Sequence, residues 1–140
     1  MNNFKSIVDS FEAFASQHPV IKTFTFGNLS DTGQDVEPLL YPLFHVIPLP
    51  SQVTDQYTDF SFNIIFGDML DDVKTNQVDI VEECYMLLQD FLEYYTNQLT
   101  TYNFHVITPV TFTPFLDKLS VYIAGVEAQI VFRAEGTFCL

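Results

Sequence analysis

The fold of this chain is decided by the stretch YTDFSFNIIF, residues 57–66. Apolar side chains recur at every second position from Phe60 to Phe66, and polar side chains occupy the positions between them up to Asn63. Successive side chains of a β-strand point to opposite faces, so this alternation predicts a strand with one apolar face. Ile65 interrupts the polar side and places apolar surface on the second face as well.

Apolar residues at helical spacing predict two amphipathic helices, one on each side of this strand in the sequence. The first covers residues 3–18 and ends there, because Pro19 disfavours helical geometry at the residue before it. The second covers residues 77–95, with Asn76 as its N-cap.

Shorter alternating or apolar runs bounded by Gly and Pro predict further strands. They lie at residues 22–28, 41–47, 102–108 and 119–133, the last with a bend or bulge at Gly125. The polar segments 29–40, 51–56, 67–75 and 108–118 are expected as connections. The order helix, three strands, helix, two strands predicts a single α+β domain, residues 1–140, with a mostly antiparallel β-sheet and two helices packed on one face.

The composition is acidic and apolar at once. The 140 residues include 18 Asp and Glu but only five Lys and Arg, which gives a formal net charge of -13, and 48% are hydrophobic. Intrinsic disorder combines high charge with low hydrophobicity, so this composition excludes it. Independent DNA binding is not expected either, because duplex DNA is held mainly by Lys and Arg on its phosphates.

Neither a membrane anchor nor a disulfide framework is expected. No run of 18 apolar residues occurs, and the N-terminus lacks a basic region followed by a long apolar stretch. Cys84 and Cys139 lie far apart, and Cys84 has the spacing of a core residue of the second helix. This cysteine usage is typical of a protein made in a reducing cytoplasm.

The search for catalytic or metal-binding patterns gives no candidate. His45 and His105 lie within predicted strands and are interpreted as structural. The sequence contains no zinc, P-loop, dinucleotide or nucleophile-elbow motif. The acidic run at Asp68, Asp71 and Asp72 lacks the Gly and terminal Glu of an EF-hand loop, so a solvated loop is favoured over a calcium site.

Several predicted strands carry apolar residues on both faces, which has a consequence for assembly. In the strand at 41–47, Phe44 and Val46 lie opposite Leu43 and Ile47. A sheet with helices on one face has to cover its other face or present it to a partner. We therefore expect this protein to assemble through sheet edges or sheet faces.

Six short motifs accompany this order of elements: FTFGNLSD (24–31), YPLF (41–44), FNIIFGDM (62–69), VEEC (81–84), TPVTFTPF (108–115) and LSVYIAGV (119–126). Together with the order of elements, they resemble small neck and tail-completion proteins of tailed bacteriophages. The similarity is to the tail-terminator type, especially in phages that infect Bacteroidetes, and it extends over nearly the whole chain.

The resemblance implies a structural virion protein that forms a homo-oligomeric ring, hexamer or dodecamer, at the junction of neck and tail. Such a ring completes the tail, contacts other neck, portal-side and tail proteins, and surrounds a channel through which DNA passes without specific binding. No enzymatic activity, cofactor or membrane association is implied, and assembly takes place in the cytoplasm of a bacterial host. A head-closure adaptor, another virion assembly protein such as a baseplate component, and a small-ligand-binding domain or unrecognised enzyme remain alternatives.

Within this scheme, acidic loops line the channel or its rim, because like charge keeps DNA from adhering. The candidate residues, in the loops 29–40 and 67–76, are Asp31, Asp35, Asp68, Asp71 and Asp72. Ring contacts are assigned to the strands 57–66 and 119–133 and to the loops 29–40 and 108–118, where strand addition would pair exposed edges. The candidate contact residues are Tyr57, Ile65, Phe112, Phe115, Tyr122 and Ile123.

Overall fold

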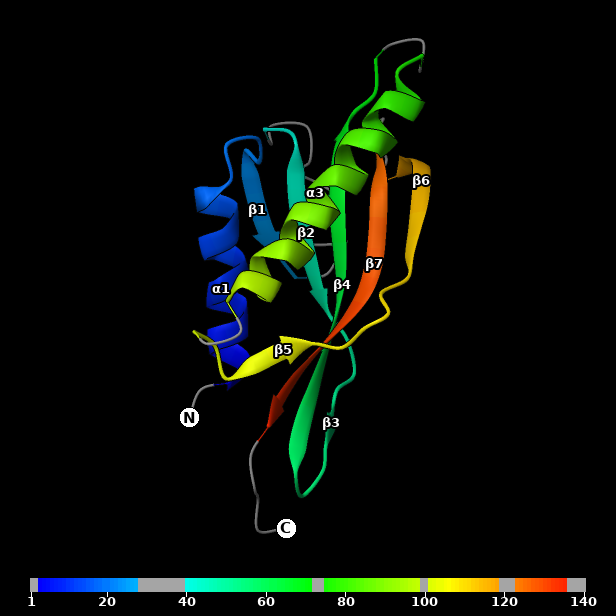
Figure 1. The fold of residues 1–140 in the computed structure, drawn as a ribbon. Coiled ribbons are helices and arrows are strands. Elements are labelled where there is room, and N and C mark those ends of the chain that lie inside the picture. The colour runs from blue at the N-terminus through cyan, green and yellow to red at the C-terminus, as the bar shows by residue number, and fades with distance from the viewer. Residues whose placement is uncertain (1–2, 28–39, 72–74, 99–100, 119–122, 136–140) are drawn as a thin grey trace.

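The long strand expected from residues 57–66 is the centre of a seven-stranded sheet in a computed structural model of the chain (Figure 1). The structure describes residues 3–27, 40–71, 75–98, 101–118 and 123–135. The helices are α1 (Asn3–Gln17) and α3 (Gln77–Asn97). The strands are β1 (Thr23–Phe26), β2 (Leu43–Pro48), β3 (Gln52–Val53), β4 (Tyr57–Met69), β5 (Phe104–Val106), β6 (Phe112–Lys118) and β7 (Ile123–Glu135).

The sheet is built on the pairing of β4 with β7, which is antiparallel over all 13 residues of each strand. The strand order is β1-β2-β4-β7-β5, with β3 added to β4 and β6 added to β7. β1 pairs with β2 in parallel, and the other pairings are antiparallel. The expected α+β class with a mostly antiparallel sheet is confirmed.

Both helices pack on the same face of the sheet, as the sequence predicts (Figure 1). The core between the layers is aromatic: the ring of Phe11 on α1 lies within 5.1 to 6.2 Å of Phe44, Phe62, Phe91 and Phe132. These rings come from both helices and from the three central strands, so one cluster joins the two layers. Edge-to-face contacts of this kind add to the stabilisation from burial alone.

The opposite face carries apolar side chains at one end and polar side chains further along. Leu43, His45 and Ile65 are buried there, although register places them on the side away from the helices. Asn63 and Gln129 are cross-strand neighbours on the same face. This face is therefore partly apolar and partly polar. The apolar part agrees with the apolar residues expected on both faces of these strands.

Three sequence expectations about element boundaries are wrong. The segment 108–118, expected as a connection, contains strand β6, and β3 lies in the polar segment 51–56. The central strand continues through Gly67 to Met69, where an acidic connection is expected from the sequence. In each case pairing with β4 or β7 holds the segment as a strand, although its own side chains do not alternate clearly.

The bend or bulge expected at Gly125 does not occur in the pairing of β4 with β7, but the pairing of β6 with β7 becomes irregular directly after the Phe115–Gly125 pair. The register of β4 with β7 is continuous through the Gly67–Gly125 pair, and the irregularity lies instead in β6, between Phe115 and Lys118. Gly125 is needed for another reason. A Cβ at this position would lie 1.9 Å from the carbonyl oxygen of Phe66, so only glycine allows this approach of the two strands.

None of the helices in the described part of the chain is long and apolar enough to cross a membrane.

Candidate functional surfaces

Asp68, a candidate channel residue, lies on the helix side of β4 and faces Glu83 of α3. Partial burial, the charge of Asp68 and a hydrogen bond between the two side chains together raise the pKa of Glu83 above its usual value. The backbone N–H of Met69 also donates to Asp68 Oδ1 over 2.8 Å. Asp68 is thus part of a contact between β4 and α3.

Asp71, the next candidate, organises the connection into α3. Its carboxylate accepts a hydrogen bond of 2.7 Å from the backbone N–H of Thr75 and another from the Thr75 hydroxyl. Asn76 stands at the expected N-cap position, but its side chain does not cap the helix. Asn76 Oδ1 accepts the N–H of Asp71 at 2.9 Å, and Nδ2 reaches the carbonyl of Met69 at 3.5 Å. Asp71 therefore has a structural role in addition to its charge.

The other candidate channel residues, Asp31, Asp35 and Asp72, lie outside the described residues, as does the candidate contact residue Tyr122. Assignment of acidic residues to a channel consequently stays a prediction.

The described contact candidates divide into buried and accessible side chains. Ile65 and Ile123 are each 1% exposed and belong to the interior of the subunit. Phe115 is half-buried, and a Cβ on Gly67 would lie 3.7 Å from its ring, so it covers the closest approach of β4 and β7. Phe112 is 38% exposed and stacks on Tyr85 of α3, with ring centroids 5.2 Å apart. Among these four, Phe112 offers the most accessible apolar surface.

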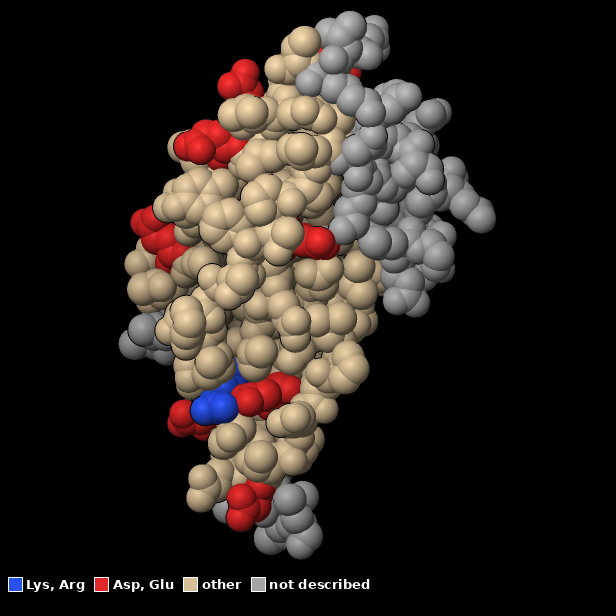
Figure 2. Space-filling view, turned by 90° about the vertical axis from the view of Figure 1, so that its right-hand side faces the viewer, with Lys and Arg blue, Asp and Glu red and all other residues tan. Residues whose placement is uncertain are grey.

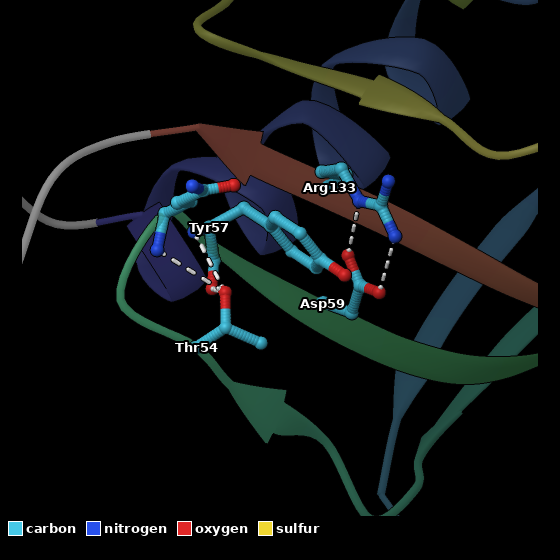
Figure 3. A network of polar contacts seen from close by, with 5 residues as sticks. Thr54, Tyr57, Asp59 and Arg133 are labelled. Atoms are coloured by element: carbon cyan, nitrogen blue, oxygen red, sulfur yellow. Dashed lines mark hydrogen bonds and ion pairs between the residues drawn. The ribbon is translucent and has the colours of Figure 1, made fainter.

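Tyr57 belongs to a polar network at the far end of β4 (Figure 3). The guanidinium of Arg133 on β7 lies 3.7 Å from the centre of the Tyr57 ring and donates to both carboxylate oxygens of Asp59, at 2.8 and 2.9 Å. Thr54 closes the preceding turn by accepting the N–H of Tyr57 at 3.0 Å. The sequence analysis did not predict this network. The one indication in the sequence is that Arg133 and Asp59 each lie within a strand rich in apolar residues.

The outer side of α3 is strongly acidic. The helix contains Asp79, Glu82, Glu83, Asp90 and Glu93 but no Lys or Arg. In Figure 2, which looks onto the β6 side of the molecule, Asp and Glu are spread along the surface and blue is confined to one small area beside red groups. The described surface on this side therefore has an excess of negative charge, which disfavours binding to a phosphate backbone.

The described residues contain neither a cluster of metal ligands nor a reactive cysteine. They contain no group of three or more His, Cys, Asp or Glu side chains that could hold a metal ion. Cys84 is buried in the core, and burial raises the pKa of its thiol, so it is held in the unreactive protonated form. A cleft of about 170 Å³ lies between α3 and β5, and larger open grooves of about 450 and 400 Å³ lie between α1 and residues 101–104 and beside Asn63 and Gln129.

No protein-family model matches this chain, and no curated protein is significantly similar to it.

Proposed function

We propose that this protein is a structural subunit of the virion of a tailed bacteriophage. In this proposal it forms a ring at the junction of neck and tail, completes the tail and surrounds the DNA channel. The observation that carries the proposal is the accessible apolar surface at the β6 end of the sheet. There Phe112 and Leu116, 38% and 51% exposed, lie on a strand that pairs with β7 and, among the described residues, with no strand on its other side.

An open strand edge beside exposed apolar side chains suits a protein that completes its fold by assembly. Soluble monomers usually protect such edges, because an unpaired edge invites association with another chain. Pro114 on β6 has no backbone N–H and cannot donate a hydrogen bond to an added strand. Side chains would therefore contribute most of the contact between this edge and another chain. This supports an assembly role more strongly than a role in binding a small ligand.

The acidic charge supports the second part of the proposal, passage of DNA without adhesion. A ring of copies that each carry -13 presents few cations to the phosphates of DNA. This argument does not depend on which of the acidic residues line the channel.

The direct test is mass spectrometry and cryo-electron microscopy of virions purified from the host of the encoding phage. We expect the protein in stoichiometric amounts, with density for a ring between portal and tail tube. Its presence only in infected cells and not in virions would overturn the proposal. A ring on the portal side of the neck would favour the head-closure alternative instead.

The role of charge is tested separately with Asp31→Asn/Asp35→Asn. We expect this variant to fold normally and to eject DNA more slowly. Asp71→Asn is a poor probe of charge, since it also removes hydrogen bonds that hold the connection before α3. Unchanged ejection by the double variant would count against an electrostatic role for these loop residues.

A further inference from the structure

Aromatic side chains form one exposed cluster at the end of the molecule where α1 begins. Phe4 on α1 is 44% exposed and Phe26 at the end of β1 is 39% exposed, while Phe60 on β4 is half-buried. The centre of the Phe4 ring lies 6.4 Å from that of Phe26 and 5.9 Å from that of Phe60. We name these three residues the aromatic patch. A contiguous apolar surface of this kind is typical of a contact site, whereas exposed apolar residues that occur singly need no partner.

The apolar surface continues onto β3. Val53 is 59% exposed and pairs with Thr58 of β4, which pairs in turn with Ala134 of β7. Paired residues point to the same side of a sheet, and Thr58 and Phe60 are two residues apart on one strand. Val53 therefore lies on the face of the sheet that carries Phe60, in the part where β3, β4 and β7 extend beyond the helices (Figure 1).

An apolar segment of the same chain follows β7 at this end of the sheet. Residues 136–140, with the sequence GTFCL, lie outside the described residues. They include no charged side chain, although the whole chain has a net charge of -13, and Phe138 and Leu140 are large and apolar. Such a composition favours burial against another apolar surface.

The segment begins within reach of the aromatic patch. Glu135, the last residue of β7, pairs with Tyr57, and Tyr57 lies three residues before Phe60 on β4. Three residues of a strand span about 10 Å, and five residues of extended chain span up to about 17 Å. Gly136 stands at the start of the segment, and glycine permits the backbone angles of a tight reversal. Residues 137–140 are therefore long enough to run back along the sheet as far as Phe60.

We propose that residues 136–140 turn back and dock on the aromatic patch of their own chain, with Phe138 against its rings. The segment is tethered within reach of the patch, and a short tether gives an effective concentration in the millimolar range. A second copy has to approach against the repulsion between two chains that each carry -13. Both considerations favour docking within one chain over exchange between copies, and neither rests on the proposed function.

The first experiment is disulfide trapping in the full chain with Val53→Cys. Cys139 lies within the docking segment, whereas Cys84 is buried in the core and burial raises the pKa of its thiol, so Cys84 does not compete. We expect mild oxidation to join positions 53 and 139 within one chain, which peptide mapping and a monomeric mass detect. The matched control is Val78→Cys at the start of α3, an exposed valine at the opposite end of the molecule (Figure 1), which should form no such bond.

Every other result of the trapping experiment overturns the inference. A bond between two chains would place the segment on a second copy. Equal yields with Val53→Cys and Val78→Cys, or no bond with either, would show that residues 136–140 do not prefer the aromatic patch.

The second experiment measures the protection of Cys139 without an added thiol. Docking slows the reaction of Cys139 with a maleimide, because the reagent reaches the thiol only in undocked molecules. Phe26→Ser/Val53→Ser removes two exposed apolar side chains of this surface and should speed the reaction at least about fivefold, which corresponds to a docked segment in about four of five wild-type molecules. Val78→Ser/Met86→Ser on α3 is the matched control and should react at the wild-type rate.

The same reaction reports on folding. Cys84 is fully buried, so its thiol reacts only when the core opens. A patch variant in which Cys139 reacts at the wild-type rate while Cys84 stays unreactive would overturn the inference. An equal increase in the control variant on α3 would overturn it as well, because the protection would then not depend on the aromatic patch.

Discussion

Arg133 and Asp59 stand directly opposite each other on β7 and β4, and the guanidinium donates to both carboxylate oxygens at 2.8 and 2.9 Å. Both side chains are partly buried. The guanidinium of Arg133 also lies over the ring of Tyr57, 3.7 Å from its centre. The three groups join the ends of the two longest strands where these extend beyond the helices (Figure 1). A bidentate pair of this kind is stronger and more directional than an ordinary surface ion pair.

Arg133→Lys is expected to lower the midpoint of thermal unfolding although the charge is kept. Lysine cannot donate in parallel to two carboxylate oxygens, and it loses the planar contact with Tyr57. The hydrogen bond to Asp59 is the main cause of the raised pKa of Arg133, so Asp59→Asn should lower the midpoint in the same way. Differential scanning calorimetry measures both effects.

The control for this prediction is Lys5→Ala. Lys5 and Asp9 form an exposed pair at helical spacing, 2.8 Å apart, and its loss should leave the midpoint nearly unchanged. Equal effects of Arg133→Lys and Lys5→Ala would show that the network contributes no more than a surface pair. Additive effects of Asp59→Asn and Arg133→Lys would show that the two side chains are not coupled.

Gly125→Ala is expected to destabilise the protein by about 3 kcal/mol or more, because the new Cβ overlaps backbone that cannot move independently. The clash is with the carbonyl oxygen of Phe66, at 1.9 Å. Gly67→Ala is the matched control: its Cβ would meet a side-chain methyl of Ile123 at 2.8 Å, which is also too close but lies on a side chain. We expect about 1–2 kcal/mol for Gly67→Ala, measured by urea unfolding. A smaller effect at Gly125 than at Gly67 would contradict this ranking.

The sequence is sufficient for the class and for most of the core. The alternation from Phe60 to Phe66 identifies the central strand, and helical spacing places both helices to within two residues at each end. These are long, strongly periodic segments whose own side chains determine their structure. β6 could not be predicted in this way, since Pro114 and the polar residues around it are held as a strand by pairing with β7.

The surfaces were harder to predict than the fold, because they depend on residues far apart in the chain. Phe112 is a contact candidate from its sequence position, and it is exposed, but its stacking on Tyr85 of α3 is not indicated by the sequence. The Arg133–Asp59 pair joins residues 74 positions apart, and no local pattern indicates it. Ile65 and Ile123 are contact candidates from the sequence, but both side chains are buried within the subunit.

Phe62→Ala is expected to lower the free energy of unfolding by about 3–5 kcal/mol. Phe62 is fully buried, and its ring contacts those of Phe4, Phe11 and Phe132 at 5.1 to 5.9 Å, so its loss leaves a cavity between the sheet and α1. Phe112→Ala, at an exposed position, should cost no more than about 1 kcal/mol. Denaturant unfolding of both variants checks the prediction, and a fully stable Phe62→Ala would place this ring outside the core.

Glu83→Gln is expected to stabilise the protein at neutral pH, by less than about 1 kcal/mol because the site is partly exposed. Burial and Asp68 raise the folded-state pKa of Glu83 above 4.5, so the folded chain holds this proton more tightly than the unfolded chain. The resulting stability is present at low pH and is lost as pH rises through the folded pKa. Glu82→Gln, which removes the same charge from an exposed position one residue away, should show no such gain. A gain of equal size in both variants would indicate relief of net charge rather than of the Glu83–Asp68 contact.

His45 is expected to make the protein less stable in mild acid. The side chain is fully buried, its Nδ1 lies 2.6 Å from the hydroxyl of Thr25, and Nε2 has no hydrogen-bond partner among the described residues. Burial lowers the pKa of His45 below 6.5, and this effect exceeds that of the nearby Gly27 backbone, which raises it. Below pH 6.5, His45 therefore binds a proton in the unfolded chain but not in the folded chain. The free energy of unfolding falls with pH until the folded-state pKa of His45 is reached.

His45→Leu removes this proton uptake and the unpaired Nε2 together. We expect its free energy of unfolding at neutral pH to lie within about 1 kcal/mol of the wild type, since the lost bond to Thr25 is offset by burial of an apolar group. Between neutral pH and pH 5, about 1.4 kcal/mol should be lost for each unit of pKa difference in the wild type and not in the variant. The measurement is urea unfolding across this range, with Thr25→Val/His45→Leu to remove the hydroxyl left without its partner. Parallel pH profiles for wild type and His45→Leu would mean that the folded and unfolded chains bind this proton equally, so that burial does not lower the pKa of His45.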